Sequence, residues 1–259
     1  MESKIYLLQD NIKTIGKGVR YPPHQKMSTA YDYTASNSIH KLRHTHFPDF
    51  EPNLSYALLS KGVTLNDKIG SSPFPFYVLF VSKNLVDFIK DFNLPKHKLY
   101  KVEVIQEGNA VDGYYALHIL DDEETYNYID FERSEISVCD INKRSEGVIK
   151  KLNLRSYQDF LATELEIIER NSAINYKQEP SWIIWASSLH LKRELCEAYD
   201  LFSYSRLSYP LNIKVNQKFK EAAEKSKLTG ITFSPISKSR DEIEIKSVWG
   251  ANNWTSFSF

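Results

Sequence analysis

Residues 77–95, Tyr77-Val-Leu-Phe-Val-Ser-Lys-Asn-Leu-Val-Asp-Phe-Ile-Lys-Asp-Phe-Asn-Leu-Pro95, decide the fold. The first five form an apolar run of strand length, and Ser82, which follows them, is a good helix N-cap residue. Apolar side chains then recur at i, i+3, i+4 and i+7, as on one face of a helix: Leu85, Phe88, Ile89 and Phe92. Pro95 ends the pattern, because its ring disfavours helix in the residue before it. The stretch therefore predicts a strand, a cap, a helix and a turn.

The same design occurs again near the end of the chain. Ile213-Lys-Val215 precedes the cap residue Asn216, and the segment closes on Leu228-Thr-Gly230. Four positions match at a constant spacing of 134 residues (81 to 215): Val81 with Val215, Ser82 with Asn216, Leu85 with Phe219, and Leu94 with Leu228. Such strand-to-helix joints are generic, so chance is one explanation of the match. Duplication is the other, and it favours two similar lobes.

The remaining signals complete an α+β pattern. We expect strands at Ile5–Leu8, Ile129–Val138 and Trp182–Trp185, and an antiparallel hairpin over residues 99–120. A capping box, Ser156 with Asp159, opens a helix whose expected inner face is Tyr157, Phe160, Leu161, Leu165 and Ile168. A further helix is expected over Leu189–Tyr199, and a last strand at Ile243–Ile245.

We therefore predict an α+β protein with antiparallel or mixed sheets, helices packed on one face, and pseudo-repeated lobes. The N-terminal lobe would span residues 1–150, with an arm at 10–50 and a strand-helix-hairpin unit at 75–140. The C-terminal lobe would span residues 151–259, with a helix at 156–170 and the second unit at 211–235. A chain of 259 residues can bury the core that either one large domain or two small lobes need.

Composition excludes several classes of protein. Lysine plus arginine and aspartate plus glutamate both number 33, and this zero net charge argues against a nucleic-acid binder driven by bulk electrostatics. Cys139 and Cys196 have no metal-type spacing, which is typical of a reduced intracellular protein, although one disulfide is an alternative. The chain start lacks a signal-peptide pattern, and no apolar run approaches the roughly 20 residues of a membrane span. We expect a cytoplasmic protein without membrane or nucleic-acid partners.

The arm at residues 10–50 is polar, turn-rich and without periodicity, which predicts a wrapped arm, a flexible segment or a site. Its His40, His44 and His46 are the candidate metal ligands, because closely spaced imidazoles can share one ion. A further ligand would come from His24, Asp49 or Glu51. Lys41 and Arg43 lie among the histidines, and their charges weaken cation binding. An exposed polar segment is the competing interpretation. Two other histidines, His118 and His190, lie in apolar patterns and are expected in or near the core.

Two further segments are candidates for binding a protein partner. Asp121, Asp122, Glu123 and Glu124 form an acidic patch that would suit a basic groove, or else a solvated turn. The tail carries Trp249 and Trp254, which either close the core or dock on a partner. No nucleophile elbow, phosphate loop or dinucleotide fingerprint occurs, so we assign no catalytic residue and no cofactor.

The apolar and capping motifs together resemble a known family. They are Tyr199-Asp-Leu-Phe202, Leu211-Asn-Ile-Lys-Val215-Asn216, Lys218-Phe-Lys-Glu-Ala222, Lys227-Leu-Thr-Gly-Ile-Thr-Phe233, Phe80-Val-Ser-Lys-Asn-Leu85, Phe92-Asn-Leu-Pro95, Tyr114-Tyr115 and Ile129-Asp-Phe131. Over residues 75–235 the chain resembles bacterial immunity proteins of polymorphic toxin systems, formerly a domain of unknown function. Asn216 stands where that family often has Ser, and the first 70 residues have no counterpart.

This resemblance implies a non-catalytic inhibitor that binds and occludes one cognate toxin encoded nearby. Aromatic and arginine side chains would anchor the complex. The alternative is a metal-dependent enzyme or metal-binding protein that uses the His40, His44 and His46 segment. A toxin-like reading frame upstream with a stoichiometric complex favours the first; bound zinc that is lost on changing His44 and His46 to alanine favours the second.

Overall fold

Three β-sheets and the helices on them make up an α+β fold in a computed structural model that describes residues 4–75, 77–141, 143, 147–174, 181–207, 213–236 and 243–246. The largest sheet is mixed, because β3 and β6 run parallel while its other pairs are antiparallel. Its order is β2 (His24–Lys26), β3 (Ala57–Leu59), β6 (His97–Gln106), β7 (Asn109–Ile119), β5 (Val78–Ser82) and β4 (Lys68–Ile69).

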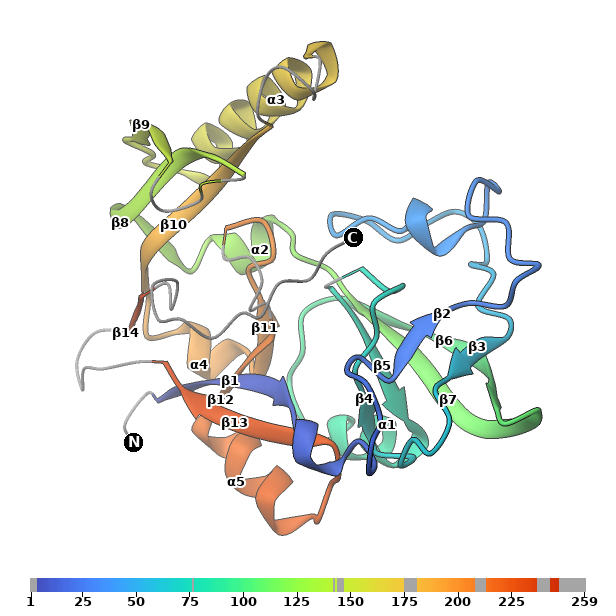
Figure 1. Ribbon diagram of the computed structural model, residues 1–259. Coiled ribbons are helices and arrows are strands. Elements are labelled where there is room, and N and C mark those ends of the chain that lie inside the picture. The colour runs from blue at the N-terminus through green and yellow to red at the C-terminus, as the bar shows by residue number, and fades with distance from the viewer. Residues whose placement is uncertain are drawn as a thin grey trace.

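The two smaller sheets are antiparallel. One has the order β11 (Leu201–Ser203), β12 (Ile213–Asn216), β1 (Ile5–Asp10) and β13 (Ile231–Pro235). The other has the order β14 (Ile243–Lys246), β10 (Trp182–Leu191), β8 (Ile129–Asp140) and β9 (Val148–Leu152). Figure 1 shows this last sheet with α3 (Tyr157–Ala173) on one side of the molecule, away from the large sheet.

The strand-cap-helix unit expected at residues 77–95 is confirmed. β5 leads directly into α1 (Lys83–Ile89), and the Ser82 side chain accepts a hydrogen bond from the Leu85 amide. Along β5, Val78 and Phe80 contact one core while Leu79 and Val81 contact another. The apolar run is continuous because both faces of this strand are covered.

The second unit has the same local structure. β12 leads into α5 (Gln217–Lys225), and the Asn216 side chain accepts a hydrogen bond from the Phe219 amide at 3.0 Å. The match is displaced at the closing turn, because α5 has 9 residues and α1 has 7. By their hydrogen bonds Asn93 corresponds to Thr229, and the expected pairing of Leu94 with Leu228 does not hold.

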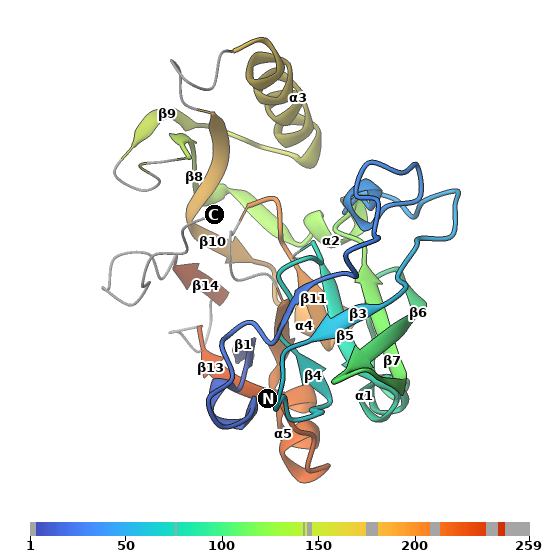
Figure 2. The ribbon, with the colours of Figure 1, turned by 45° about the vertical axis from the view of Figure 1, so that its right-hand side comes forward.

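The two units lie against each other in one core. Phe219 of α5 is fully buried, and its ring lies 5.4 Å from the ring of Phe88 and 4.9 Å from the ring of Phe92. Figure 2 shows α1 and α5 side by side below the sheets. The units therefore share a hydrophobic core instead of occupying separate lobes.

Two carboxylates, those of Asp67 and Asp200, join the units, because each accepts hydrogen bonds from both of them. Asp67, just before β4, accepts hydrogen bonds from Ser82 of its own unit and from the backbone amide of Thr229 in the other, at 2.6 and 2.8 Å. Asp200, just before β11, accepts from Asn216 of its own unit at 2.8 Å and from the Asn93 amide of the other at 2.9 Å. Each unit thus holds the closing turn of its partner.

Strand pairing crosses the boundary between lobes that the sequence predicts near residue 150. Residue 150 lies inside β9, which pairs with β8 from the expected N-terminal lobe, and β8 pairs with β10 from the expected C-terminal lobe. In addition β1, from the start of the chain, lies between β12 and β13. Strand pairing over long sequence separations decides this arrangement, and periodicity within a segment carries no information about it.

The helix that begins at Ser156 is confirmed, but its inner face is shifted. Tyr157, Phe160 and Ile167 are buried, whereas Leu165 and Ile168 are 59% and 55% exposed. The helix expected over Leu189–Tyr199 is wrong in its extent, because residues up to Leu191 extend β10 and within this range α4 (Leu195–Ala198) is the helical part. The expected hairpin is confirmed as β6 and β7, and the expected strands as β1, β8, β10 and β14.

Candidate functional site

The arm at residues 10–50 is folded over the large sheet. It contains β2 and two short 3-10 helices, η1 (Ile12–Thr14) and η2 (Ile39–Lys41). Met27, Tyr31, Ile39 and Leu42 of the arm are buried against the outer face of the sheet. Figure 1 shows the arm in blue beyond β2 and β3. The wrapped arm, one of the three interpretations of this segment, is found, and part of the same arm also forms the candidate site.

Three consecutive backbone carbonyls hold the end of η2 to the protein. The Tyr77 hydroxyl donates to the Leu42 carbonyl at 3.0 Å, and the His118 Nε2 donates to the Arg43 carbonyl at 2.7 Å. The Asp121 amide donates to the His44 carbonyl, also at 2.7 Å. A loop that is held through its backbone keeps its side chains free and its geometry fixed before binding, which reduces the entropic cost of association.

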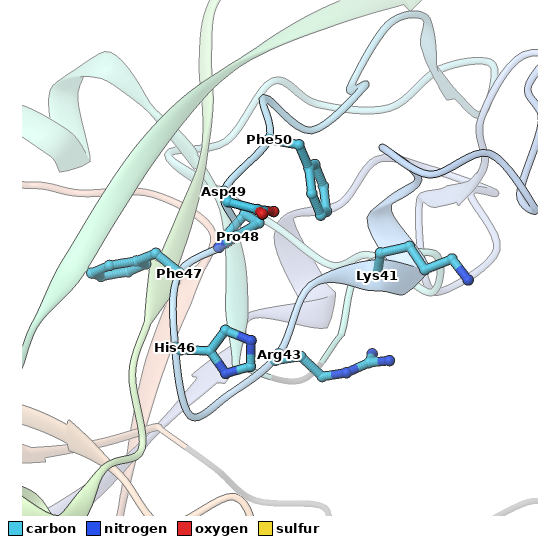
Figure 3. A pocket seen from close by; sticks show the side chains of 7 residues that line it. All are labelled: Lys41, Arg43, His46, Phe47, Pro48, Asp49 and Phe50. Atoms are coloured by element: carbon cyan, nitrogen blue, oxygen red, sulfur yellow. The ribbon is translucent and has the colours of Figure 1, made fainter.

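A hollow of about 290 Å³ lies on this clamped loop. We call it the arm hollow, and its lining residues are Lys41, Arg43, His46, Phe47, Pro48, Asp49 and Phe50. In Figure 3 Lys41 and Arg43 extend together on one side, and the Phe50 ring lies across from them. Phe47 points away from these two, and its ring lies 5.4 Å from the ring of His118. Phe47 thus anchors the loop, and Phe50 borders the hollow.

The two cations of the arm hollow are exposed and have no carboxylate partner within ion-pair distance in the described part of the chain. Among the described residues, Arg43 donates to two backbone carbonyls, those of His40 at 3.2 Å and Leu42 at 3.0 Å. By contrast, Lys68, Lys96 and Arg206 each pair with a carboxylate. The hollow therefore presents two cations without an ion-pair partner among the described residues, together with the single carboxylate of Asp49, beside an aromatic ring.

The expected metal site does not form among the described residues, where no group of three or more His, Cys, Asp or Glu side chains could hold an ion. His40 packs against Tyr33, His44 packs against Tyr77, and the exposed His46 lies in the arm hollow. Each imidazole thus has a different neighbour, which sequence spacing could not reveal. His118 is buried and His190 half-buried, as expected.

The acidic patch is divided by the structure. Asp121 is fully buried, and its carboxylate accepts hydrogen bonds from the Ser205 hydroxyl at 2.6 Å and the Arg206 amide at 3.2 Å. Asp122 caps α2 (Glu123–Tyr126) and pairs with Lys96, which also pairs with Glu124. Glu123 is exposed and accepts a hydrogen bond from Gln158. Asp121 is therefore unable to contact a partner, because it lies in the interior; Trp249 and Trp254 fall outside the described residues.

Sequence reasoning missed a largely buried ionic cluster next to Asp121, whose amide donates to the His44 carbonyl and whose carboxylate accepts from the Arg206 amide. Arg206 forms two hydrogen bonds with the carboxylate of Glu164, and its guanidinium lies 4.5 Å from the centre of the Phe160 ring. Glu164 lies outside the inner face that the sequence predicts for α3. A helical face does contain it, because Glu164 shares the side of α3 that holds Phe160 and Ile167, but nothing in the sequence connects α3 with residue 206.

Burial shifts the pKa values of two further members of this cluster. Burial raises the pKa of Asp121 to about 6, although the Ser205 hydrogen bond and the charge of Arg206 oppose the shift. Burial also lowers the pKa of Lys214 to about 8. Perturbed groups often mark active sites. These two side chains are 0% and 1% exposed, so no solute reaches them in this structure and a structural role follows.

Two histidines with lowered pKa values, the buried His24 and the half-buried His44, predict a loss of stability on acidification. Burial lowers the pKa of His24 and of His44 to about 4, from 6.5. Between about pH 6.5 and pH 4 these two imidazoles are protonated in the unfolded chain and neutral in the folded one. The stability that is present above about pH 6.5 is therefore lost as the pH falls toward 4. Asp121, whose folded pKa is raised, gains a proton in the folded state below about pH 6 and offsets only one of the two.

We expect the urea midpoint to fall between about pH 7 and pH 5, and to fall less in His44→Gln than in the parent chain. His97→Gln, at the exposed start of β6, is the matched control, and its urea midpoint should fall by as much as that of the parent chain between these two pH values. A midpoint that rises on acidification, or an equal fall in His44→Gln and His97→Gln, would contradict this interpretation.

No helix in the described ranges is both long enough and apolar enough to cross a membrane. Neither the models of protein families nor the curated proteins contain a match to this chain.

Proposed function

We propose that this protein is an immunity protein that binds a cognate bacterial toxin and neutralises it by occlusion, without catalysis. The motifs of residues 75–235 that resemble such proteins support the proposal. Most of the described motifs lie in the two strand-cap-helix units and in β7 and β11, and Ile129-Asp-Phe131 begins β8 in another sheet. The proposed binding surface lies outside these motifs, on the arm at residues 10–50.

The clamped loop with the arm hollow is the observation that carries the proposal. Protein interfaces depend on a few aromatic and arginine side chains presented in fixed positions. Arg43 and Phe50 meet this description, because three carbonyls of residues 42–44 hold the loop while both side chains line the hollow. The metal-dependent alternative gains no such support from the described residues, where no metal-binding group is found.

The proposal predicts protection of cells that carry the toxin. Co-expression of this chain with the product of the neighbouring toxin-like gene should restore growth and yield a stoichiometric complex. Phe50→Ala should lower the affinity about tenfold, as expected for an interface anchor. Leu165→Ala, an equally simple truncation of an exposed side chain on α3, should bind as the parent does. Growth arrest despite full expression of the folded parent chain would refute the function.

A further inference from the structure

We propose that the arm hollow binds a carboxylate-bearing segment of the partner protein, so that the partner presents acidic side chains at this point. The inference deepens the proposed function by naming the chemistry of the bound surface. It reverses the expectation from the sequence, in which the acidic patch at residues 121–124 would face a basic groove. Asp121 is buried, and Asp122 and Glu124 are already paired with Lys96.

Positive charge without an ion-pair partner is the first reason for this inference. Lys41 and Arg43 outnumber the single carboxylate of Asp49 in the lining of the hollow, and neither is paired with it at ion-pair distance. A guanidinium matches the two oxygens of a carboxylate with parallel hydrogen bonds. In the part of the chain that the structure describes, the Arg43 head group bonds to two backbone carbonyls through Nη1, so it has donors left for such an acceptor.

Size and apolar lining are the second reason. A volume of about 290 Å³ lies at the lower limit for small-molecule sites and suits one or two side chains of a peptide. Phe50 and Pro48 supply apolar contact beside the cations. We therefore expect an acidic residue next to an apolar or aromatic one in the bound segment.

A nucleic acid fits these observations less well than a protein. Nucleic-acid binding draws on many phosphate contacts, and its affinity comes from a large basic surface. Here two cations stand beside the carboxylate of Asp49, and the whole chain has no net charge. A carboxylate pair with an apolar neighbour matches this local pattern.

The first test uses two capped tripeptides, Glu-Phe-Glu and its neutral counterpart Gln-Phe-Gln, titrated into the isotopically labelled full chain. At about millimolar concentration, the acidic peptide should shift the amide resonances of residues 40–50, and the neutral one should bind about tenfold more weakly. The double variant Lys41→Glu/Arg43→Glu should lose these shifts. Equal shifts with both peptides, or shifts located elsewhere, would overturn the inference.

A labelled single-stranded oligonucleotide provides the competing outcome. If the full chain binds it more tightly than the acidic peptide, and Lys41→Glu/Arg43→Glu abolishes that binding, then the hollow is a phosphate site and the inference is wrong. Unchanged anisotropy of the oligonucleotide supports the carboxylate.

The second test uses the toxin itself. Lys41→Glu/Arg43→Glu should raise the Kd of the complex at least about tenfold at low salt, mainly through slower association. Lys150→Glu/Lys151→Glu on β9 carries the same change of charge at exposed positions and should leave the Kd nearly unchanged. Thermal unfolding of each variant checks that it is folded.

The two proposals fail in different ways. If the parent chain binds the toxin and the Lys41→Glu/Arg43→Glu variant binds equally well, the carboxylate inference is wrong and the immunity function stands. If the parent chain neither binds nor protects, the immunity function fails, and the peptide titration alone then decides whether the hollow selects carboxylates.

Discussion

Replacing Phe219 by alanine is expected to lower the free energy of unfolding by about 3–5 kcal/mol. Phe219 is fully buried where the two strand-cap-helix units meet, and its ring contacts those of Phe88 and Phe92. Truncation would leave a cavity between α1 and α5, since both helices begin at fixed caps and neither can move freely into the space.

Equilibrium urea unfolding measures this effect. Leu165→Ala is the control, because the same kind of truncation at an exposed site on α3 should change the free energy by no more than about 0.5 kcal/mol. A loss below about 1 kcal/mol for Phe219→Ala would show that the units do not depend on their shared core.

Removing the carboxylate of Asp200 is expected to cost about 3 kcal/mol of stability. Its two oxygens accept hydrogen bonds from the Asn93 amide, the Asn216 side-chain amide and the Lys218 ammonium, at 2.8 to 2.9 Å. In Asp200→Ala the Asn93 amide loses its acceptor. The unit that contains α1 is then held less firmly to the unit that contains α5.

Asp67→Ala should have a similar cost, because Asp67 performs the same role from the other unit. Burial alone would raise its pKa, but hydrogen bonds from Ser82 and Thr229 outweigh burial and lower it. The double variant Asp67→Ala/Asp200→Ala should lose less stability than the two single losses together, since either change already loosens the same contact between units.

A double-mutant cycle by urea unfolding tests this coupling. Asp87→Ala, which removes an exposed carboxylate paired with Lys83 and Lys90, should leave the urea midpoint nearly unchanged, because solvent screens these pairs. Strict additivity of Asp67→Ala and Asp200→Ala would contradict a joint role of the two carboxylates.

The location of the candidate site could be predicted from the sequence, but its chemistry depends on contacts between residues far apart in the chain. The sequence directed attention to residues 10–50 and to their histidines, because a long aperiodic segment rich in polar groups stood out. It suggested a metal, whereas the fold gives His44 an aromatic neighbour and gives Arg43 an exposed position on a clamped loop. The hydrogen bonds of residues 42–44 with Tyr77, His118 and Asp121 set this arrangement, and the sequence does not reveal them.

By itself the sequence determined the local elements: both strand-cap-helix units, the hairpin of β6 and β7, and the start of α3 at Ser156. Their causes are local, since capping and apolar spacing act within about one or two turns of chain. Tertiary structure alone decided that the two units share a core, that Asp67 and Asp200 hold each other's turns, and that Arg206 meets Glu164. Each of these contacts joins residues far apart in the chain, and burial gives them their energy only once the sheets have assembled.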